Sequence, residues 1–448
     1  MSCPTEELLL RSAEEKAPDL LAHLQDCAAC RDTVRELEET IGELRAAAPT
    51  AAPASGERLL RLRPPAPSTR AARRLFAVAA AMLLAATGFA IFPSKSKPPR
   101  PPESTPKPEV RRTPEPKPTA PAKRQDFPER SEWISGGLGW LDQNQKADGS
   151  FGSVGLTGLA LMAWFGDGHG DASAAHGRSI QSALVYLLAT QGADGLLAQP
   201  SEPKVIYGHA IATWALSEAV GDGRTADPRV RLAAQRAVDY LLAAQNPGMA
   251  WRYSSKCGDN DTSVTFWAVG ALASARKAGF RVPDDSFAGA RAFFGSVTDP
   301  ELLRVGYTFP RTGKVFVPGV NEAYRHHEAL SAAAAAARLM MGDARDDAMV
   351  SAMGFLATDL PSAAKETDVD YYYWHLGSLA LFLHDGAESF NWAEWENRLL
   401  PALRAKRAAD GSWEPNDRWG KVDAAGRAYA TALNVLTLEV PRRLPAKK

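Results

Sequence analysis

The sequence predicts an all-α protein whose larger part is an (α/α)6 toroid, a ring of six inner helices surrounded by six outer ones. A small-residue-rich apolar segment recurs six times, each time after an amphipathic segment and a turn. Helices that are apolar nearly all round are buried, whereas amphipathic helices face solvent, so the alternation predicts two concentric rings. No segment of any length has the period of a strand. We expect the inner helices at Val154–Phe165, Tyr207–Val220, Thr262–Ala275, Glu322–Met341, Tyr373–His384 and Arg427–Val440.

A recurring turn motif is the second observation. In each copy a helix ends, a glycine turn follows, and an apolar residue packs back on the helices. The copies are Leu141-x3-Gln145-x3-Gly149 with Phe151, Leu187-x3-Gln191-x3-Gly195 with Leu197, Leu403-x3-Arg407-x3-Gly411 with Trp413, and the looser Leu241-x3-Gln245 leading to Trp251.

This Gln-x3-Gly-x-Trp/Phe pattern is similar to the QW repeat of squalene and other terpenoid cyclases, and to the toroid of protein prenyltransferases. The resemblance covers residues 131–444. It implies, for class II cyclases, an acid that protonates an alkene from the middle of an Asp-x-Asp-Asp motif. The two candidates, Asp261 in Asp-Asn-Asp-Thr and Asp370 in Asp-Val-Asp-Tyr, lack the last aspartate. Both also suit the N-cap of a helix, so cyclase chemistry is not expected.

Two other chemistries of related toroids fit no better. The zinc site of prenyltransferases needs an Asp, a Cys and a His, but Cys257, Asp259 and the His326-His327 pair do not reproduce its spacing. Cys257-Gly-Asp-Asn260 is similar to the Cys-Gly-Glu-Gln of thioester proteins, but Asn260 is one methylene shorter than glutamine. We therefore expect a toroid without these activities.

Polar and aromatic residues gather at the starts of the expected inner helices. If these starts converge, their side chains and the positive ends of the helix dipoles form one mouth. Such a mouth suits an amphiphile, a glycan or a peptide, although the same residues can simply cap and plug the ring. The candidate ligand-binding residues are Tyr207, His209, Asp261, Tyr324, His326, His327, Tyr373, His375, Arg427 and Tyr429.

The uncharged run Leu75–Phe92 is long enough, at about 1.5 Å per residue, to cross a hydrocarbon core as a helix. Basic residues stand on both sides of it, and more than 70 residues precede it, so a cleaved signal peptide fits badly. The run therefore predicts a single transmembrane helix.

A candidate metal site precedes this run. On one helix, His23, Cys27 and Cys30 share a face, and Cys3 can complete a tetrahedral Cys3His zinc site. So small a segment would depend on the metal for its folding free energy. The motif resembles the His-x3-Cys-x2-Cys of bacterial zinc-binding anti-sigma factors, which implies a cytoplasmic module and a sigma factor or another cytoplasmic protein as partner.

These observations divide the chain. Four cysteines are too few for a disulfide scaffold, and a net charge of zero argues against a direct nucleic-acid binder. Proline-rich residues after the apolar run predict an extended spacer. The expected parts are a zinc module (1–48), a juxtamembrane linker (49–74), a transmembrane helix (75–92), a proline-rich linker (93–130) and the toroid (131–444).

Two functional interpretations follow. The main one is a bacterial inner-membrane protein with a cytoplasmic zinc module and an extracytoplasmic toroid that senses a ligand without cyclase chemistry. The alternative is an exported toroid enzyme that acts on an isoprenoid, a lipid or a polysaccharide.

Overall fold

The computed structural model describes residues 127–198, 204–311, 329–417, 420–422 and 425–444. The zinc ligands Cys3, His23, Cys27 and Cys30, the run Leu75–Phe92 and nearly all of the linker that follows it lie outside these residues. Within the described part, no helix is long and apolar enough to cross a membrane.

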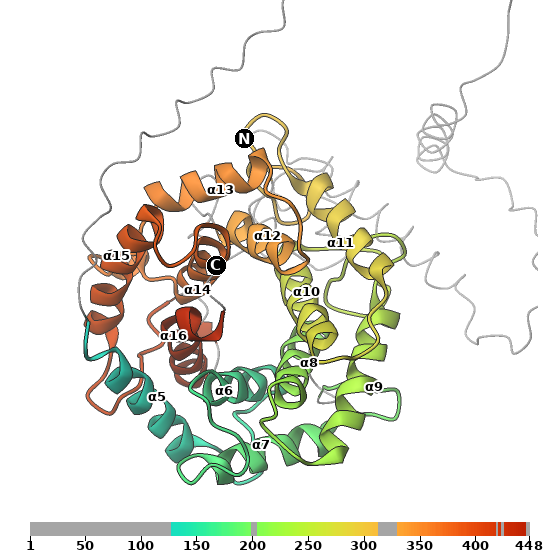
Figure 1. Ribbon diagram of the computed structural model, residues 1–448, viewed down its shortest axis with the longest axis vertical. Coiled ribbons are helices and arrows are strands. Elements are labelled where there is room, and N and C mark those ends of the chain that lie inside the picture. Colours follow the sequence, from blue (N-terminus) through green and yellow to red (C-terminus); the bar gives the residue numbers. More distant parts are fainter. Residues whose placement is uncertain (1–126, 199–203, 312–328, 418–419, 423–424, 445–448) are drawn as a thin grey trace, which may run out of the picture. The chain divides into compact units, whose positions relative to one another are not determined.

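Twelve α-helices in the described residues form two concentric rings, which confirms the predicted all-α toroid (Figure 1). The ring closes because the last helix, α16, packs against both α5 and α6. The inner ring holds α6 (Val154–Gly166), α8 (Val205–Gly221), α10 (Thr262–Lys277), α12 (Ala329–Met340), α14 (Tyr371–Asp385) and α16 (Gly426–Arg443). The outer ring holds α5 (Arg130–Asn144), α7 (Gly177–Thr190), α9 (Pro228–Ala244), α11 (Asp284–Val297), α13 (Asp347–Thr358) and α15 (Phe390–Lys406). Two short 3-10 helices, η3 (Glu366–Asp368) and η4 (Gly420–Val422), lie in the connections.

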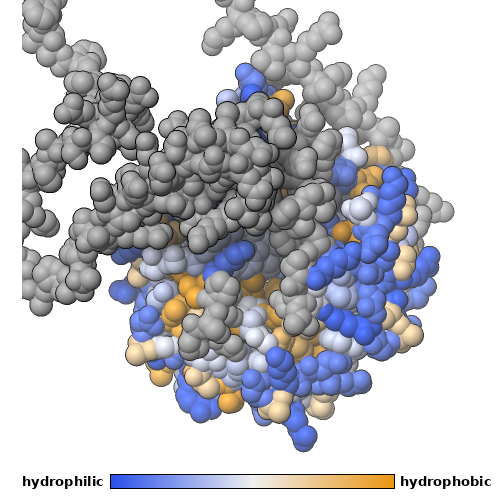
Figure 2. Space-filling model, turned by 180° about the vertical axis from the view of Figure 1, so that it is seen from behind, coloured by the Kyte–Doolittle hydropathy of each residue, from blue (hydrophilic) through white to orange (hydrophobic). Residues whose placement is uncertain are grey.

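The predicted inner helices agree with the observed ones, since five of them match to within three residues at either end. The exception is α12, which is described only from Ala329, after the expected start at Glu322. Inner helices pack closely where small residues meet, and a Cβ on Gly158 of α6 would come within 3.0 Å of the Ala212 Cα on α8. On the face shown in Figure 2, hydrophilic residues occupy the periphery and hydrophobic residues gather toward the middle.

The glutamine of the turn motif ties neighbouring outer helices together. Gln191, at the end of α7, donates from Nε2 to Gly195 O (3.1 Å) in its own turn and to Ala233 O (2.9 Å) on α9. The same pair of bonds is made by Gln145 to Gly149 O and Ser179 O, and by Gln245 to Met249 O and Ser286 O. The motif that resembles the QW repeat therefore links each of these outer helices to the next one, because one amide group bonds both its own turn and the following outer helix.

The turn of this motif requires a glycine. Gly195 has a φ of 96°, and a Cβ there would overlap the carbonyl oxygen of Arg236 on α9. Replacing Gly195 by alanine should therefore lower the free energy of unfolding by at least about 2 kcal/mol, measured by urea denaturation. Gly223→Ala is the matched control, because φ is also positive there (64°) but no atom lies within 4 Å of the added Cβ. Equal losses in the two variants would show that the contact with α9 does not matter.

Candidate functional site

A cavity of about 600 Å³ opens where the inner helices end. All six contribute to it, and six of the lining residues in or next to the last turns of α6, α8 and α10 are small, which leaves space in the middle of the ring. Those residues are Gly166, Ser217, Gly221, Ala273, Ser274 and Ala278. The cavity volume falls in the range of about 300–1,000 Å³ that is usual for sites that bind small molecules.

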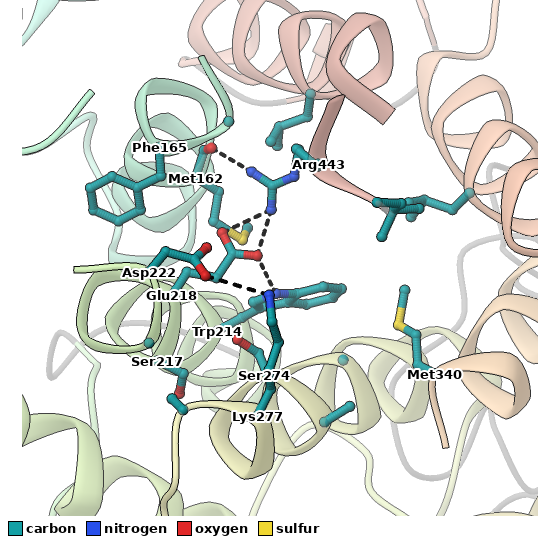
Figure 3. Close-up of a pocket in the computed structure, with 18 of the residues that line it drawn as sticks. Met162, Phe165, Trp214, Ser217, Glu218, Asp222, Ser274, Lys277, Met340 and Arg443 are labelled. Atoms are coloured by element: carbon teal, nitrogen blue, oxygen red, sulfur yellow. Dashed lines mark hydrogen bonds and ion pairs between the residues drawn. The ribbon is translucent and has the colours of Figure 1, made fainter. Parts of the chain in front are cut away.

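One ion pair dominates the cavity wall. Arg443, near the end of α16, donates from Nη2 to both Glu218 carboxylate oxygens (2.6 and 2.8 Å) and from Nη1 to Met162 O (2.6 Å). Trp214, one turn before Glu218 on α8, donates from Nε1 to Glu218 Oε1 (2.9 Å). Both charged side chains are largely buried, with about 15% of their surface exposed. The carboxylate of Glu218 is thereby fixed in orientation (Figure 3).

A second carboxylate lies one turn further along α8, at the rim. Asp222 follows directly after α8, and its Oδ1 lies 3.4 Å from Lys277 Nζ on α10 (Figure 3). Residues four apart on a helix have Cβ atoms about 5–6 Å from each other, so Glu218 and Asp222 face the same space. Both Asp222 and Lys277 are more exposed than the Glu218 pair.

Aromatic rings form the apolar part of the wall. Trp214 and Trp267 lie edge to face, with ring centroids 5.8 Å apart, and the His375 ring stacks parallel to Trp267 at 6.4 Å. Gly270 makes this possible, because a Cβ there would overlap the Trp214 ring. Both indoles are nearly buried, with 9% of Trp214 and 2% of Trp267 exposed, so they offer the cavity a narrow apolar surface next to its charged groups.

A hydrogen-bonded cluster supports the aromatic wall from the side of the helix starts. Trp267 Nε1 donates to the Tyr207 hydroxyl (3.1 Å), which also contacts Ser263 Oγ (3.1 Å) and the Tyr372 hydroxyl (3.2 Å). Burial raises the pKa of both tyrosines, which therefore stay neutral. Among the described residues, these side chains therefore pack on one another near the helix starts, where the sequence predicted a mouth.

His209, which the sequence predicted to bind a ligand, instead has a structural role. It is fully buried, it accepts from Leu197 N at Nδ1 (3.0 Å), and its Nε2 contacts Ala237 O (3.0 Å). Burial lowers its pKa to about 4, so the ring is neutral. In other repeats, the backbone N–H of the motif's apolar residue donates to a threonine hydroxyl instead. Phe151 N, for example, donates to Thr157 Oγ1 (3.1 Å).

The two weak catalytic candidates both cap inner helices. Asp261 accepts from Val264 N (2.8 Å) at the start of α10, and burial raises its pKa to about 6. Asp370 accepts from Tyr373 N (2.9 Å) at the start of α14. In both places the observed contact is the N-cap bond that the sequence also allowed.

The remaining described candidates, His375 excepted, lie away from this cavity, although Tyr429 is near enough to Tyr207, Tyr372 and Asp370 for electrostatic interactions with them to add to burial in raising its pKa. Tyr373 donates to Asp359 O (2.6 Å), Arg427 pairs with Glu414 (2.5 Å), and the Tyr429 hydroxyl lies 3.4 Å from Asp417 Oδ2. Among the described candidates only His375 lines the cavity, where burial lowers its pKa to about 3. Tyr324, His326 and His327 lie outside the described residues.

Sequence reasoning missed the charged residues of the cavity. Glu218, Asp222, Lys277, Arg442 and Arg443 all stand in the last turn of an apolar inner helix or just after it. A signal was available, because charges that end an otherwise apolar segment must reach solvent or pair with one another.

Comparisons with known proteins bear on the fold. No protein-family model matches the sequence, and no curated protein matches it either. Among solved structures, the chain is similar to the α-1,6-mannanase GH76A of Salegentibacter sp. HEL1_6, solved as an inactive variant in complex with α-1,6-mannotriose. The two share 9% sequence identity with a TM-score of 0.50, over 70% of this chain and 99% of the mannanase. At this identity the likeness shows the toroid fold alone.

The comparison corrects our main functional prediction. We expected a membrane protein that couples a zinc module to a ligand-sensing toroid without cyclase chemistry. The toroid instead shares its fold with an α-1,6-mannanase. Nothing in the comparisons supports membership in the anti-sigma or terpenoid cyclase families.

Proposed function

We propose that this chain is an enzyme that cleaves a polysaccharide in the cavity at the ends of the inner helices. The observation that carries the proposal is the wall of this cavity, where the indole rings of Trp214 and Trp267 stand beside the carboxylates of Glu218 and Asp222. Sugar rings have apolar C–H faces and polar edges, so they fit flat aromatic walls next to fixed hydrogen-bonding groups. The mannanase with the same fold acts on such a chain of sugars.

Hydrolysis of a glycosidic bond needs two carboxyl groups, of which one protonates the leaving oxygen and the other acts from the opposite side on water or on the sugar. Glu218 is the better oriented of the two, since Arg443 and Trp214 hold both of its oxygens. We assign Glu218 to the second role and the more exposed Asp222, next to Lys277, to proton donation.

The catalytic pair would differ from that of the mannanase, whose inactive variant has two adjacent aspartates changed to asparagine. This chain has two adjacent aspartate pairs, Asp284-Asp285 and Asp346-Asp347. Both stand at the starts of outer helices and neither lines the cavity. The proposed reaction therefore rests on the carboxylates of α8.

The charge of the cavity favours a neutral substrate. The negative ends of the inner-helix dipoles point there, and cations near these ends offset them. Those cations are themselves engaged, because Arg443 pairs with Glu218, Lys277 with Asp222, and Arg442 with Asp167 (2.7 Å). Neutral hexose polymers, of which α-1,6-mannan is the first to try, fit this balance better than acidic ones.

Release of reducing ends from a panel of polysaccharides by the purified full-length chain tests the proposal. We expect turnover on at least one neutral polymer, retained in Glu132→Gln, which changes an exposed glutamate of α5, and lost in Glu218→Gln. Turnover that survives Glu218→Gln, or none on any polymer, contradicts the proposal.

The N-terminal predictions are independent of the cavity and stay predictions. They are the inner-membrane location with the toroid outside, the cytoplasmic partner, and the zinc site of Cys3, His23, Cys27 and Cys30. For the metal, we expect one zinc ion per full-length chain by elemental analysis, because thiolates and imidazole are the ligands zinc prefers. Replacing Cys27 and Cys30 together by serine should remove it, whereas Cys257→Ser should not. Equal zinc content in the two variants would rule the site out.

A further inference from the structure

One buried acid at the cavity has no role in the reaction as proposed. Glu439 lies on α16, one turn before Arg443, and is 0% exposed. Among the residues that the structure describes, neither of its carboxylate oxygens has a hydrogen-bond partner. It sits directly behind the cavity wall at Gly166, where a Cβ would overlap Glu439 Oε2. The absence of a side chain at Gly166 is what makes room for this carboxyl group.

Charged groups from several helices surround Glu439. Arg443 and Arg442 come from α16 itself, Glu218 from α8, and Asp167 from the end of α6. Burial raises the pKa of Glu439 well above its usual range, and the two neighbouring carboxylates add to this effect while the arginines oppose it. The acid therefore keeps its proton under conditions in which an exposed glutamate has lost it.

The other charged groups near α16 are already engaged. Arg442 donates to Asp167 Oδ1 and to Ser131 Oγ (2.7 Å each), and Arg130 of α5 is held by Glu396 (2.6 Å) and by Leu438 O (2.9 Å). On α14, His375 is kept neutral by burial and by the charge of Arg443. Arg443 is also engaged, by Glu218, but it is the cation nearest to Glu439: residues four apart on a helix are neighbours, and both side chains lie next to Gly166.

We propose that Glu439 is a positioning residue whose proton decides whether Arg443 stays on Glu218. While Glu439 is protonated, Arg443 binds Glu218 and holds its carboxylate in place. When Glu439 loses its proton, two carboxylates compete for one guanidinium, and the glutamate on the same helix draws Arg443 away. Glu218 then loses the contact that fixes both of its oxygens. For catalysis, this inference rests on the proposed role of Glu218; the exchange of partners does not.

The indole of Trp214 reports this exchange without any substrate, because its Nε1–H donates to the same Glu218 carboxylate. The test is a pH titration of the Trp214 indole resonance by nuclear magnetic resonance, on the full-length chain labelled with 15N-tryptophan. The resonance is assigned with Trp214→Phe, and Trp413, which donates to Leu403 O away from this cluster, is the internal reference.

We expect the Trp214 resonance to shift with a midpoint above the ordinary glutamate range, and this shift to be lost in Glu439→Gln. Glu396→Gln, which changes another buried glutamate that faces an arginine, should keep the shift. Gly166→Ala, which displaces the carboxyl group without removing it, should move the midpoint. An identical titration in wild type and Glu439→Gln, or no shift in wild type, overturns the inference.

The enzyme assay gives a second, separate readout. If the polysaccharide proposal holds, the pH profile of kcat/KM should contain one ionisation that Glu439→Gln lacks and Glu396→Gln retains. If no polymer is cleaved, the proposed function fails while the tryptophan titration still decides the role of Glu439.

Discussion

Replacing Glu218 by glutamine should lower kcat on the polysaccharide by about 10³-fold or more, because an amide cannot act as a base or a nucleophile. The change is nearly isosteric, and it keeps an acceptor for Trp214 and Arg443. KM should therefore change little, whereas the thermal midpoint of unfolding should fall, because the largely buried Arg443 loses its charged partner. Steady-state kinetics of the purified variant, with circular dichroism as a check of the fold, measure both effects.

Asp222→Asn separates the two proposed roles. As the proposed proton donor, Asp222 should matter less for substrates whose leaving group needs no protonation. We therefore expect Asp222→Asn to recover much of its kcat on an activated aryl glycoside, whereas Glu218→Gln stays inactive on both substrates. Recovery in Glu218→Gln instead would mean that the two roles are exchanged. If both variants are as active as wild type, neither carboxylate takes part in the reaction.

Acid should destabilise the toroid through His209. Its pKa is about 4 in the fold but near 6.5 in an unfolded chain, so between these values the unfolded state binds the extra proton. The stabilisation is fully present above pH 6.5 and is lost as pH falls to about 4, a loss of about 3 kcal/mol in the free energy of unfolding. Urea denaturation across this pH range measures it.

His209→Gln isolates this effect, because glutamine can accept from Leu197 N and donate to Ala237 O without titrating. Asp261 and Glu439 act in the opposite direction, since their raised pKa values make the fold lose stability as pH rises. These contributions are the same in wild type and in His209→Gln, so they cancel when the two free energies of unfolding are subtracted. A difference that does not change with pH would mean that His209 already binds its proton in the folded state.

The helices were predictable because their signal is local. An apolar run between two turns needs no knowledge of distant contacts, so α6 and α10 were placed to within two residues at each end. The closing of the ring by α16 against α6 followed from counting six such runs.

The end at which the ring is open was not predictable in this way. The sequence shows that Tyr207, His209 and Tyr372 stand near helix starts. It does not show that the two tyrosines bond to Ser263, or that His209 bonds to Leu197 and to Ala237 on the outer helix α9. Whether a ring is hollow depends on the summed volume of side chains from all six helices. The useful signal was the small residues in the last turns, such as Gly221 and Ser274, together with the charges beside them.

Oligosaccharide binding to a matched pair of variants, one at each end of the ring, shows at which end the substrate binds. Trp214→Ala removes one aromatic wall of the cavity, whereas Arg427→Ala changes a residue at the helix starts that pairs with Glu414. Isothermal titration calorimetry of the full-length chain with an oligosaccharide of the cleaved polymer should show a Kd at least about tenfold weaker for Trp214→Ala, corresponding to about 1.4 kcal/mol, and no change for Arg427→Ala. Loss of binding in Arg427→Ala with full affinity in Trp214→Ala would place the site at the helix starts and contradict the account.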